Sequence, residues 1–270
     1  MKSEGEYSEM RPGVDLPIGA HHYRAFVGSP DKYDLLSALQ FNVLTFLGLR
    51  EYHTLLDIGC GSLRAGKLLI AYLLPHRYFG IEPEHWLIEK GIEQECGKDL
   101  ISIKSPTFSN DTNFTCTTFG QKFDFLLAQS IFSHATEMQI RQCLSQASAC
   151  MHPQSLFVAT FVEGPENYRG TEWVYPGVVT YTQTHLQDLA AEHGLALKLL
   201  HWPHPNNQTW AVIAFPETLE GVSGPSDVVA MERLKNQLAQ CETKLARLEE
   251  HPYVKLGLRL RKLLTAAKRR

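Results

Sequence analysis

The sequence lacks the features of several protein classes. No apolar run approaches the roughly 20 residues that a membrane-spanning helix needs, and residues 1–13 are polar, unlike a signal peptide. The six cysteines are scattered without a C-x-x-C pair, which favours free thiols in a reducing compartment. The 12 histidines are dispersed too, so no metal site is predicted. We expect a cytoplasmic protein with an ordinary globular core.

An excess of positive charge is also missing from most of the chain. The formal net charge is −3, but residues 226–270 carry 11 Lys and Arg against 5 Asp and Glu. The other 225 residues are acidic, with 15 basic against 24 acidic groups. A nucleic-acid partner held by a basic face is therefore not expected, and the basic tail needs its own explanation.

What is present is a glycine turn between two apolar runs. Residues 55–61 read LLDIGCG, a predicted helix follows over 62–73, and a second apolar run at 78–81 ends in Glu82. This order is typical of a βαβ unit that wraps a nucleoside-bearing cofactor. Glycines let the main chain approach a ligand closely, and the free N–H groups at the start of the helix face the same place. A carboxylate at the end of the second strand can accept hydrogen bonds from two ribose hydroxyls.

The spacing of the glycines favours one cofactor class. The dinucleotide fingerprint G-x-G-x-x-G needs a glycine where this chain has Arg64. The pattern instead resembles motif I of the class I S-adenosylmethionine-dependent methyltransferases, acid-x-Gly-x-Gly-x-Gly, with Leu63 in place of the third glycine. Arg64 can meet the carboxylate of the cofactor or form a surface salt bridge. The resemblance implies S-adenosylmethionine as cofactor, held by Asp57, Gly59, Cys60, Gly61, Glu82 and Pro83. A nicotinamide-dependent oxidoreductase is an alternative.

The rest of the chain alternates between helical and extended patterns. Helices are predicted over residues 31–49, 62–73, 84–95, 136–151 and 184–193. Strands are predicted over residues 53–58, 78–81, 100–104, 123–128, 155–161, 196–202 and 209–215. The last two strands flank a short turn and predict an antiparallel hairpin, which is similar to the end of the methyltransferase sheet. We expect an α/β fold, a Rossmann-like, doubly wound, mostly parallel sheet with an antiparallel last strand, over residues 31–217. Residues 1–30 are expected to be a flexible lead-in or a lid.

Two further segments complete the cofactor site that the resemblance implies. After the third strand, Asp111 or Asn113 can bond the adenine amino group and Phe114 can pack on the ring. The same residues are equally typical of an Asx turn. After the fourth strand, Gln129 and Ser130 occupy the place that faces the methyl-bearing sulfur in the family.

One histidine is a candidate general base. His134 follows the fourth strand, and an imidazole titrates near neutral pH, so it can take a proton from a hydroxyl acceptor. A packing or cofactor-positioning role is the alternative. Alignment supplies much of the rate of methyl transfer, so a base is not required. The Asn/Asp-Pro-Pro-aromatic signature of enzymes that methylate base amino groups is missing, which argues against that activity.

The acceptor is expected at a long loop over residues 162–182. The candidate acceptor-binding residues are Glu163, Tyr168, Trp173, Tyr175 and, on the final hairpin, His204. Loop packing is the alternative for the aromatic ones. We expect a small-molecule or glycan acceptor, methylated on oxygen. A methyltransferase-like scaffold or regulatory subunit that binds cofactor without turnover is the second hypothesis.

The C-terminal part has two patterns. Apolar residues at heptad spacing over 231–248 predict a coiled coil within residues 226–250 and a homo-oligomer. Packing onto the body is the alternative. Residues 254–270 contain seven Lys and Arg and no acid, which resembles the basic amphipathic helix, here 253–270, of a protein at the inner face of a membrane. A disordered basic terminus is the alternative.

Overall fold

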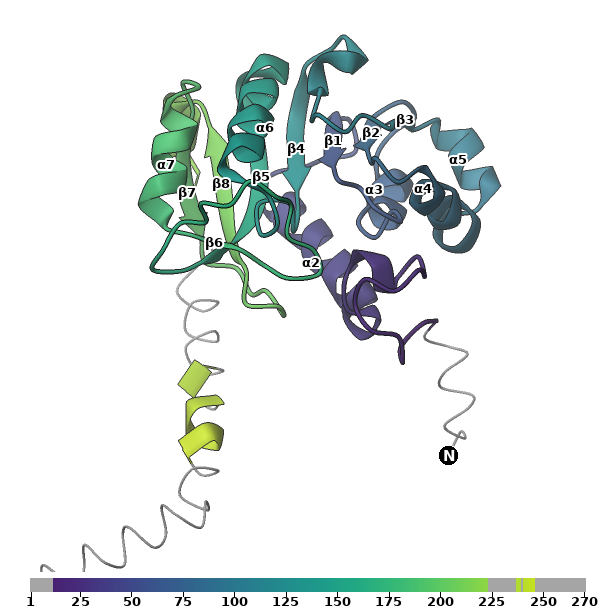
Figure 1. The fold of residues 1–270 in the computed structure, drawn as a ribbon. Helices are drawn as coiled ribbons and strands as arrows, with labels where there is room; N and C mark the ends of the chain where they lie inside the picture. Colours follow the sequence, from purple (N-terminus) through teal and green to yellow (C-terminus); the bar gives the residue numbers. More distant parts are fainter. Residues whose placement is uncertain (1–11, 223–236, 239, 246–270) are drawn as a thin grey trace, which may run out of the picture. The chain divides into compact units, whose positions relative to one another are not determined.

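The computed structural model describes residues 12–222, 237–238 and 240–245. The chain divides into two compact units, residues 1–224 and residues 225–270. The first unit is a sheet covered by helices (Figure 1). In the second unit the described residues are helical.

The sheet has the strand order β3-β2-β1-β4-β5-β8-β7, and β6 pairs with β5. Its strands are β1 (Leu55–Ile58), β2 (Tyr78–Ile81), β3 (Thr107–Ser109), β4 (Phe123–Ala128), β5 (Met151–Glu163), β6 (Thr180–Tyr181), β7 (Ala196–Leu200) and β8 (Thr209–Ala214). The first five pair in parallel. Strand β8 runs antiparallel between β5 and β7. The mostly parallel sheet with an antiparallel last strand is therefore confirmed.

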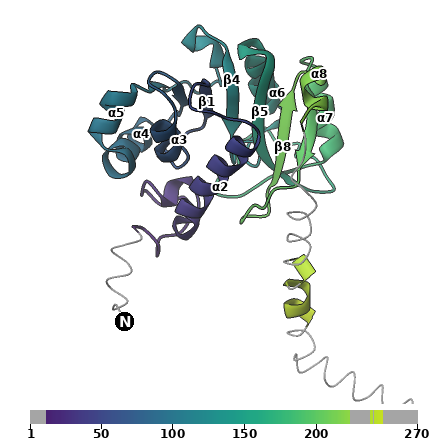
Figure 2. The ribbon, with the colours of Figure 1, turned by 180° about the vertical axis from the view of Figure 1, so that it is seen from behind.

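Helices cover both faces of the sheet (Figures 1 and 2). Leu55 and Leu127 point to the face covered by α2 (Tyr33–Phe46), α3 (Gly66–Tyr72), α4 (His85–Gly91), α5 (Lys98–Lys104) and α8 (Pro216–Glu220). Their neighbours Leu56 and Leu126 point to the face covered by α6 (Glu137–Cys150) and α7 (Gln183–Ala191). Alternation of side chains along each strand thus builds two cores, as in other doubly wound sheets.

Three sequence predictions about elements need correction. The strand predicted over residues 100–104 is helix α5, and the edge strand β3 follows it at Thr107–Ser109. Helix α3 begins at Gly66 rather than at residue 62, because the residues before it form turns. The long loop is shorter than predicted, since β5 extends to Glu163 and β6 pairs with it.

The segment before α2 is built into the first unit. It includes two 3-10 turns, η1 (Ala25–Val27) and η2 (Pro30–Lys32). Arg24 is buried and forms ion pairs with Asp34 at 3.0 Å and with Glu95 at 2.5 Å. Glu95 lies in the π-helical turn η3 (Ile92–Cys96) after α4. These bonds fasten the N-terminal segment to two helices.

The tail predictions concern mainly residues outside the described ones. Within the predicted stripe, Leu238 and Leu245 lie on the described helical residues and are 60% and 57% exposed. Met231, Leu234 and Leu248 of the stripe, and the basic residues 253–270, lie outside the described residues. The coiled coil and the membrane helix stay predictions. Among the described helices, none combines the length and the apolar character that a membrane crossing requires.

Candidate functional site

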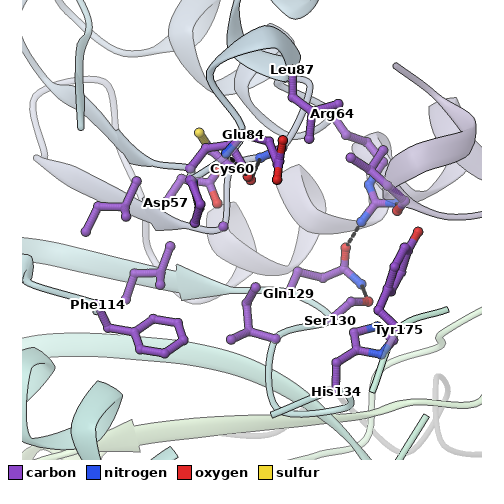
Figure 3. Close-up of a pocket in the computed structure, with 18 of the residues that line it drawn as sticks. Asp57, Cys60, Arg64, Glu84, Leu87, Phe114, Gln129, Ser130, His134 and Tyr175 are labelled. Atoms are coloured by element: carbon purple, nitrogen blue, oxygen red, sulfur yellow. Dashed lines mark hydrogen bonds between the residues drawn. The ribbon is translucent and has the colours of Figure 1, made fainter. Parts of the chain in front are cut away.

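A cavity of about 530 Å³ opens at the carboxyl ends of β1, β2 and β4 (Figure 3). Parallel sheets bind ligands at this edge, where the strand order reverses. The sequence-predicted residues that line the cavity are Asp57, Gly59, Cys60, Gly61, Glu82, Pro83, Asp111, Phe114, Gln129, Ser130, His134, Trp173 and Tyr175. The structure therefore brings residues from five separate segments to one cavity.

Four predicted site residues do not line this cavity. Asn113 and Glu163 are exposed outside it. Tyr168 donates its hydroxyl to the Glu172 carbonyl at 3.0 Å and borders a separate hollow of about 330 Å³. His204 lies behind the lining, with Nε2 3.3 Å from Nε2 of Gln129.

Several lining residues carry no motif and were not predicted. Phe26 and Val27 come from the N-terminal segment, Leu87 from α4, Ile131 from the β4–α6 connection and Gln139 from α6. The sequence around the N-terminal pair offered no signal, because contacts with residues far along the chain place that segment.

The glycine turn has little room for side chains. Gly59 has φ +72°, and a Cβ there would lie 2.3 Å from Cδ1 of Ile131. At the position of the third glycine of the motif, Leu63 adopts φ +60°. A left-handed leucine is uncommon, and it keeps the main-chain conformation that a glycine would supply.

Two buried carboxyls flank this turn. Glu82 accepts hydrogen bonds from the main-chain N–H of Gly61 at 2.9 Å and of Glu84 at 3.0 Å. Burial raises its pKa above the ordinary value, against these two bonds, which lower it. Asp57 accepts the hydroxyl of Tyr78 at 2.7 Å, and burial raises the pKa of Asp57 to about 7. Both carboxyls are held at the cavity by hydrogen bonds.

The Asp111 carboxylate closes an Asx turn. Its Oδ1 accepts the main-chain N–H groups of Asn113 at 2.8 Å and Thr115 at 2.7 Å, and its Oδ2 accepts the Thr115 hydroxyl at 2.9 Å. Burial raises the pKa of Asp111, but these bonds outweigh it and lower the pKa. Asp111 and Phe114 nevertheless border the cavity.

Arg64 is a buried cation whose partners are neutral. Its Nη1 donates to the Val27 carbonyl at 2.8 Å and its Nη2 donates to Oε1 of Gln129, a contact visible in Figure 3. Nε has no hydrogen-bond partner, and no ion pair involves Arg64, among the residues that the structure describes. Burial lowers its pKa. A buried guanidinium without a carboxylate calls for an anionic group beside it.

His134 is oriented by main-chain carbonyls. Its Nδ1 lies 2.9 Å from the oxygen of Val174 and 2.8 Å from that of Gly177. Because a carbonyl only accepts, Nδ1 carries the proton and Nε2 of the neutral ring keeps its lone pair. Burial lowers the pKa of His134 below 6.5, by more than the two carbonyls raise it. The ring is therefore neutral at pH 7.

Aromatic rings surround His134. Its ring centroid lies 5.1 Å from that of Tyr175, edge to face, and 5.6 Å from that of Trp173. The Tyr175 hydroxyl donates to the Phe26 carbonyl. Trp173 is 40% exposed at the cavity.

Within the described residues, no cluster of three or more His, Cys, Asp or Glu side chains could hold a metal ion. All six cysteines are free.

Comparison with solved structures identifies the fold. The glycopeptide N-methyltransferase MtfA complexed with S-adenosyl-L-homocysteine superposes with a TM-score of 0.51 at 10% identity, over 68% of this chain and 90% of that one. The magnesium protoporphyrin IX methyltransferase ChlM from Synechocystis PCC 6803, with the same bound ligand, gives 0.51 at 13% identity, over 78% and 94%. DesVI from Streptomyces venezuelae gives 0.51 at 13% identity, over 68% and 97%.

The chain has the class I methyltransferase fold. No protein-family model and no curated protein matches the sequence. At these low identities the likeness concerns the fold. In this chain the cavity and the glycine turn both lie at the carboxyl ends of the parallel strands.

Proposed function

We propose that this protein transfers a methyl group from S-adenosylmethionine to a hydroxyl group of a small molecule or a glycan. The observation that carries the proposal is the charge pattern of the cavity. Four carboxyls, Asp57, Glu82, Glu84 and Asp111, line it together with the single guanidinium of Arg64. S-adenosylmethionine carries an ammonium and a sulfonium beside one carboxylate, so its charges complement this pattern.

The residues present fit the parts of this cofactor. Glu82 at the end of β2 suits the ribose hydroxyls, and the glycine turn leaves space that a Cβ would fill. Arg64, which lacks an ionic partner among the described residues, suits the carboxylate. Phe114 suits the face of the adenine ring. The burial of Arg64 argues against a surface salt bridge and supports a place on the cofactor side of the cavity.

A nicotinamide dinucleotide fits less well. Its pyrophosphate is doubly negative, whereas the lining of the cavity has four carboxyls and one guanidinium. Like charges at short range oppose binding, and Arg64 stands where the dinucleotide motif needs its third glycine. These features support the methyltransferase over the oxidoreductase.

Residues of this chain can accept the proton of the acceptor and enclose the base that takes it. S-adenosylmethionine, when bound, supplies an activated methyl group on a sulfonium. His134 is held with Nε2 as the free proton acceptor, and its lowered pKa keeps it neutral at pH 7. We infer that Nε2 takes the proton of the acceptor hydroxyl as the methyl group is transferred. Trp173 and Tyr175 cover the ring and limit access of water.

The acceptor and the methylated atom are tested together. The full chain is incubated with S-adenosylmethionine labelled in the methyl group and fractions of neutral glycans, phenols and amines. Labelled product from a hydroxyl compound, lost in His134→Asn, supports the proposal. Label on nitrogen only contradicts the oxygen assignment. Cofactor binding without turnover on any fraction favours the scaffold hypothesis.

Two predictions about partners rest on the sequence of the tail. The apolar stripe over residues 231–248 supports a homo-oligomer, and the basic residues 254–270 support contact with an anionic membrane surface. Sedimentation of the full chain and of a chain ending at residue 224, alone and with anionic vesicles, tests both.

A further inference from the structure

One segment of the chain contacts both the cofactor side and the acceptor side of the cavity. Residues 20–29, here called the cap segment, lie beside the glycine turn. A Cβ added to Gly61 would lie 2.8 Å from Cγ1 of Val27. The Val27 carbonyl accepts Nη1 of Arg64 at 2.8 Å. The cap segment is thus a wall of the part of the cavity that we assign to the methionine end of the cofactor.

The cap segment also contacts the loop of residues 164–179, through Phe26, the residue before Val27. The Phe26 carbonyl accepts the hydroxyl of Tyr175, and the two rings lie 6.0 Å apart. Both residues line the cavity. Adjacent residues of the cap segment therefore bind the cofactor side and the acceptor side by their main-chain carbonyls.

The 164–179 loop in turn holds the candidate base. The main-chain N–H of Val174 donates to the His134 carbonyl at 2.9 Å, and Nδ1 of His134 is bound by the carbonyls of Val174 and Gly177. The Tyr175 ring lies edge to face on the imidazole. Each step from Arg64 to His134 is a direct contact, and the path passes through one side-chain hydroxyl.

We propose that Tyr175 is a positioning residue that couples cofactor binding at Arg64 to the placement of His134. An anionic group bound at Arg64 stabilises the contact of Arg64 with Val27, and the cap segment then keeps Phe26 in place. Because the Tyr175 hydroxyl is bonded to Phe26, the loop that orients the imidazole becomes more rigid as well. Bound cofactor then stabilises the acceptor site, which favours binding of cofactor before acceptor. The inference rests on the proposed function.

Hydrogen–deuterium exchange with mass spectrometry tests this coupling without an acceptor. The full chain is measured with and without saturating S-adenosylhomocysteine, which keeps the carboxylate. The reporters are the amides of Phe26, bonded to the His22 carbonyl, and of Val174 and Val179, bonded to the carbonyls of His134 and Ser133. In the wild type we expect exchange at all three amides to slow by at least about fivefold, the lower end of typical coupling between sites.

Tyr175→Phe removes the hydroxyl and keeps the ring. We expect it to bind S-adenosylhomocysteine at least about fivefold more weakly, because coupling is reciprocal, and to lose the ligand-dependent protection of Val174 and Val179. Tyr168→Phe is the matched control, since its hydroxyl bonds the Glu172 carbonyl within the same loop. It should behave like the wild type.

The outcomes distinguish failure of the coupling through Tyr175 from failure of the proposed function. Loss of loop protection in Tyr175→Phe alone supports the coupling. Equal loop protection in Tyr175→Phe and the wild type, or ligand binding that protects only the cap segment in the wild type, overturns it while the cofactor assignment stands. A folded wild type that does not bind S-adenosylhomocysteine overturns the proposed function and the coupling with it.

Discussion

Arg64 donates from Nη1 to the main-chain carbonyl of Val27 at 2.8 Å, across 37 positions of the sequence. A guanidinium in the turn before α3 thereby fastens the N-terminal segment to the glycine turn. Its other partner is the neutral Gln129. The charge of Arg64 is therefore available to an anionic group of a ligand, and this relationship links the fold to the proposed cofactor.

Replacement of Arg64 by methionine should weaken the binding of S-adenosylmethionine and S-adenosylhomocysteine. A hydrogen bond to a charged group contributes roughly 1.5–3 kcal/mol, which is about 10-fold to 150-fold in affinity. Isothermal titration measures the change. Methylthioadenosine, which lacks the amino-acid part, is the matched ligand and should bind both proteins equally. A similar loss for methylthioadenosine would show that Arg64 supports the cavity as a whole.

Gly59→Ala should lower both stability and ligand affinity. The new Cβ would lie 2.3 Å from Cδ1 of Ile131, and φ at this position is +72°. We expect a loss of roughly 1–3 kcal/mol in the free energy of unfolding from the clash, measured with urea. Gly97→Ala is the control, because Gly97 has φ +81° with nothing within 4 Å of its Cβ position. Equal losses of unfolding free energy in the two variants would contradict the claim that the contact with Ile131 excludes a side chain at Gly59.

Asp57→Asn should stabilise the ligand-free protein more at pH 8 than at pH 4. Burial raises the pKa of Asp57 from 3.8 to about 7. The folded protein therefore binds this proton more tightly than the unfolded chain, and the free energy of unfolding falls as pH rises between these two values. The gain should reach roughly 4 kcal/mol at most, while affinity for S-adenosylmethionine falls. Asp124→Asn should do the opposite. Burial raises the pKa of Asp124, but hydrogen bonds from Thr54 and His152 lower the pKa by more than burial raises it. Its carboxylate therefore stabilises the fold above pH 4.

The His134 imidazole should titrate below pH 6.5 and carry its proton on Nδ1. Burial lowers its pKa, and the carbonyls of Val174 and Gly177 fix the tautomer. Activity that uses Nε2 as a base should then persist through neutral pH and fall as pH drops through the lowered pKa. NMR of histidine-labelled protein, with His134→Asn for assignment, measures both properties. A proton on Nε2 would rule out His134 as the base in this form, and a raised pKa would contradict the effect of burial on the ring.

Much of the fold could be predicted because its signals are local. The run 123–128 was predicted with the bounds that the structure gives, since five of its six residues are apolar, as in a central strand. The segment 100–104 was predicted as a strand from its isoleucines. It forms a helix because Leu100 and Ile101 pack on the core while Ile103 is 66% exposed, and Ser105 ends the helix with φ +47°. Edge strand β3 is too short to carry a period.

The cofactor half of the cavity could be predicted better than the acceptor half. Residues of the glycine turn and Glu82 follow a sequence motif, and they line the cavity. Phe26 and Val27 line it because Arg24 anchors their segment through Glu95, 71 positions away, and such contacts leave no local pattern. Tyr168 and Trp173 belong to one loop, but only Trp173 borders the cavity, a difference that depends on how the loop closes.

The most direct test is isothermal titration of the full chain with S-adenosylhomocysteine and with NADH, beside Glu82→Ala checked for folding by circular dichroism. We expect micromolar binding of S-adenosylhomocysteine that is lost in Glu82→Ala, whose carboxylate lies at the turn, and no binding of NADH. Binding of NADH alone, or of neither ligand by a folded protein, would contradict the assignment of S-adenosylmethionine as the cofactor.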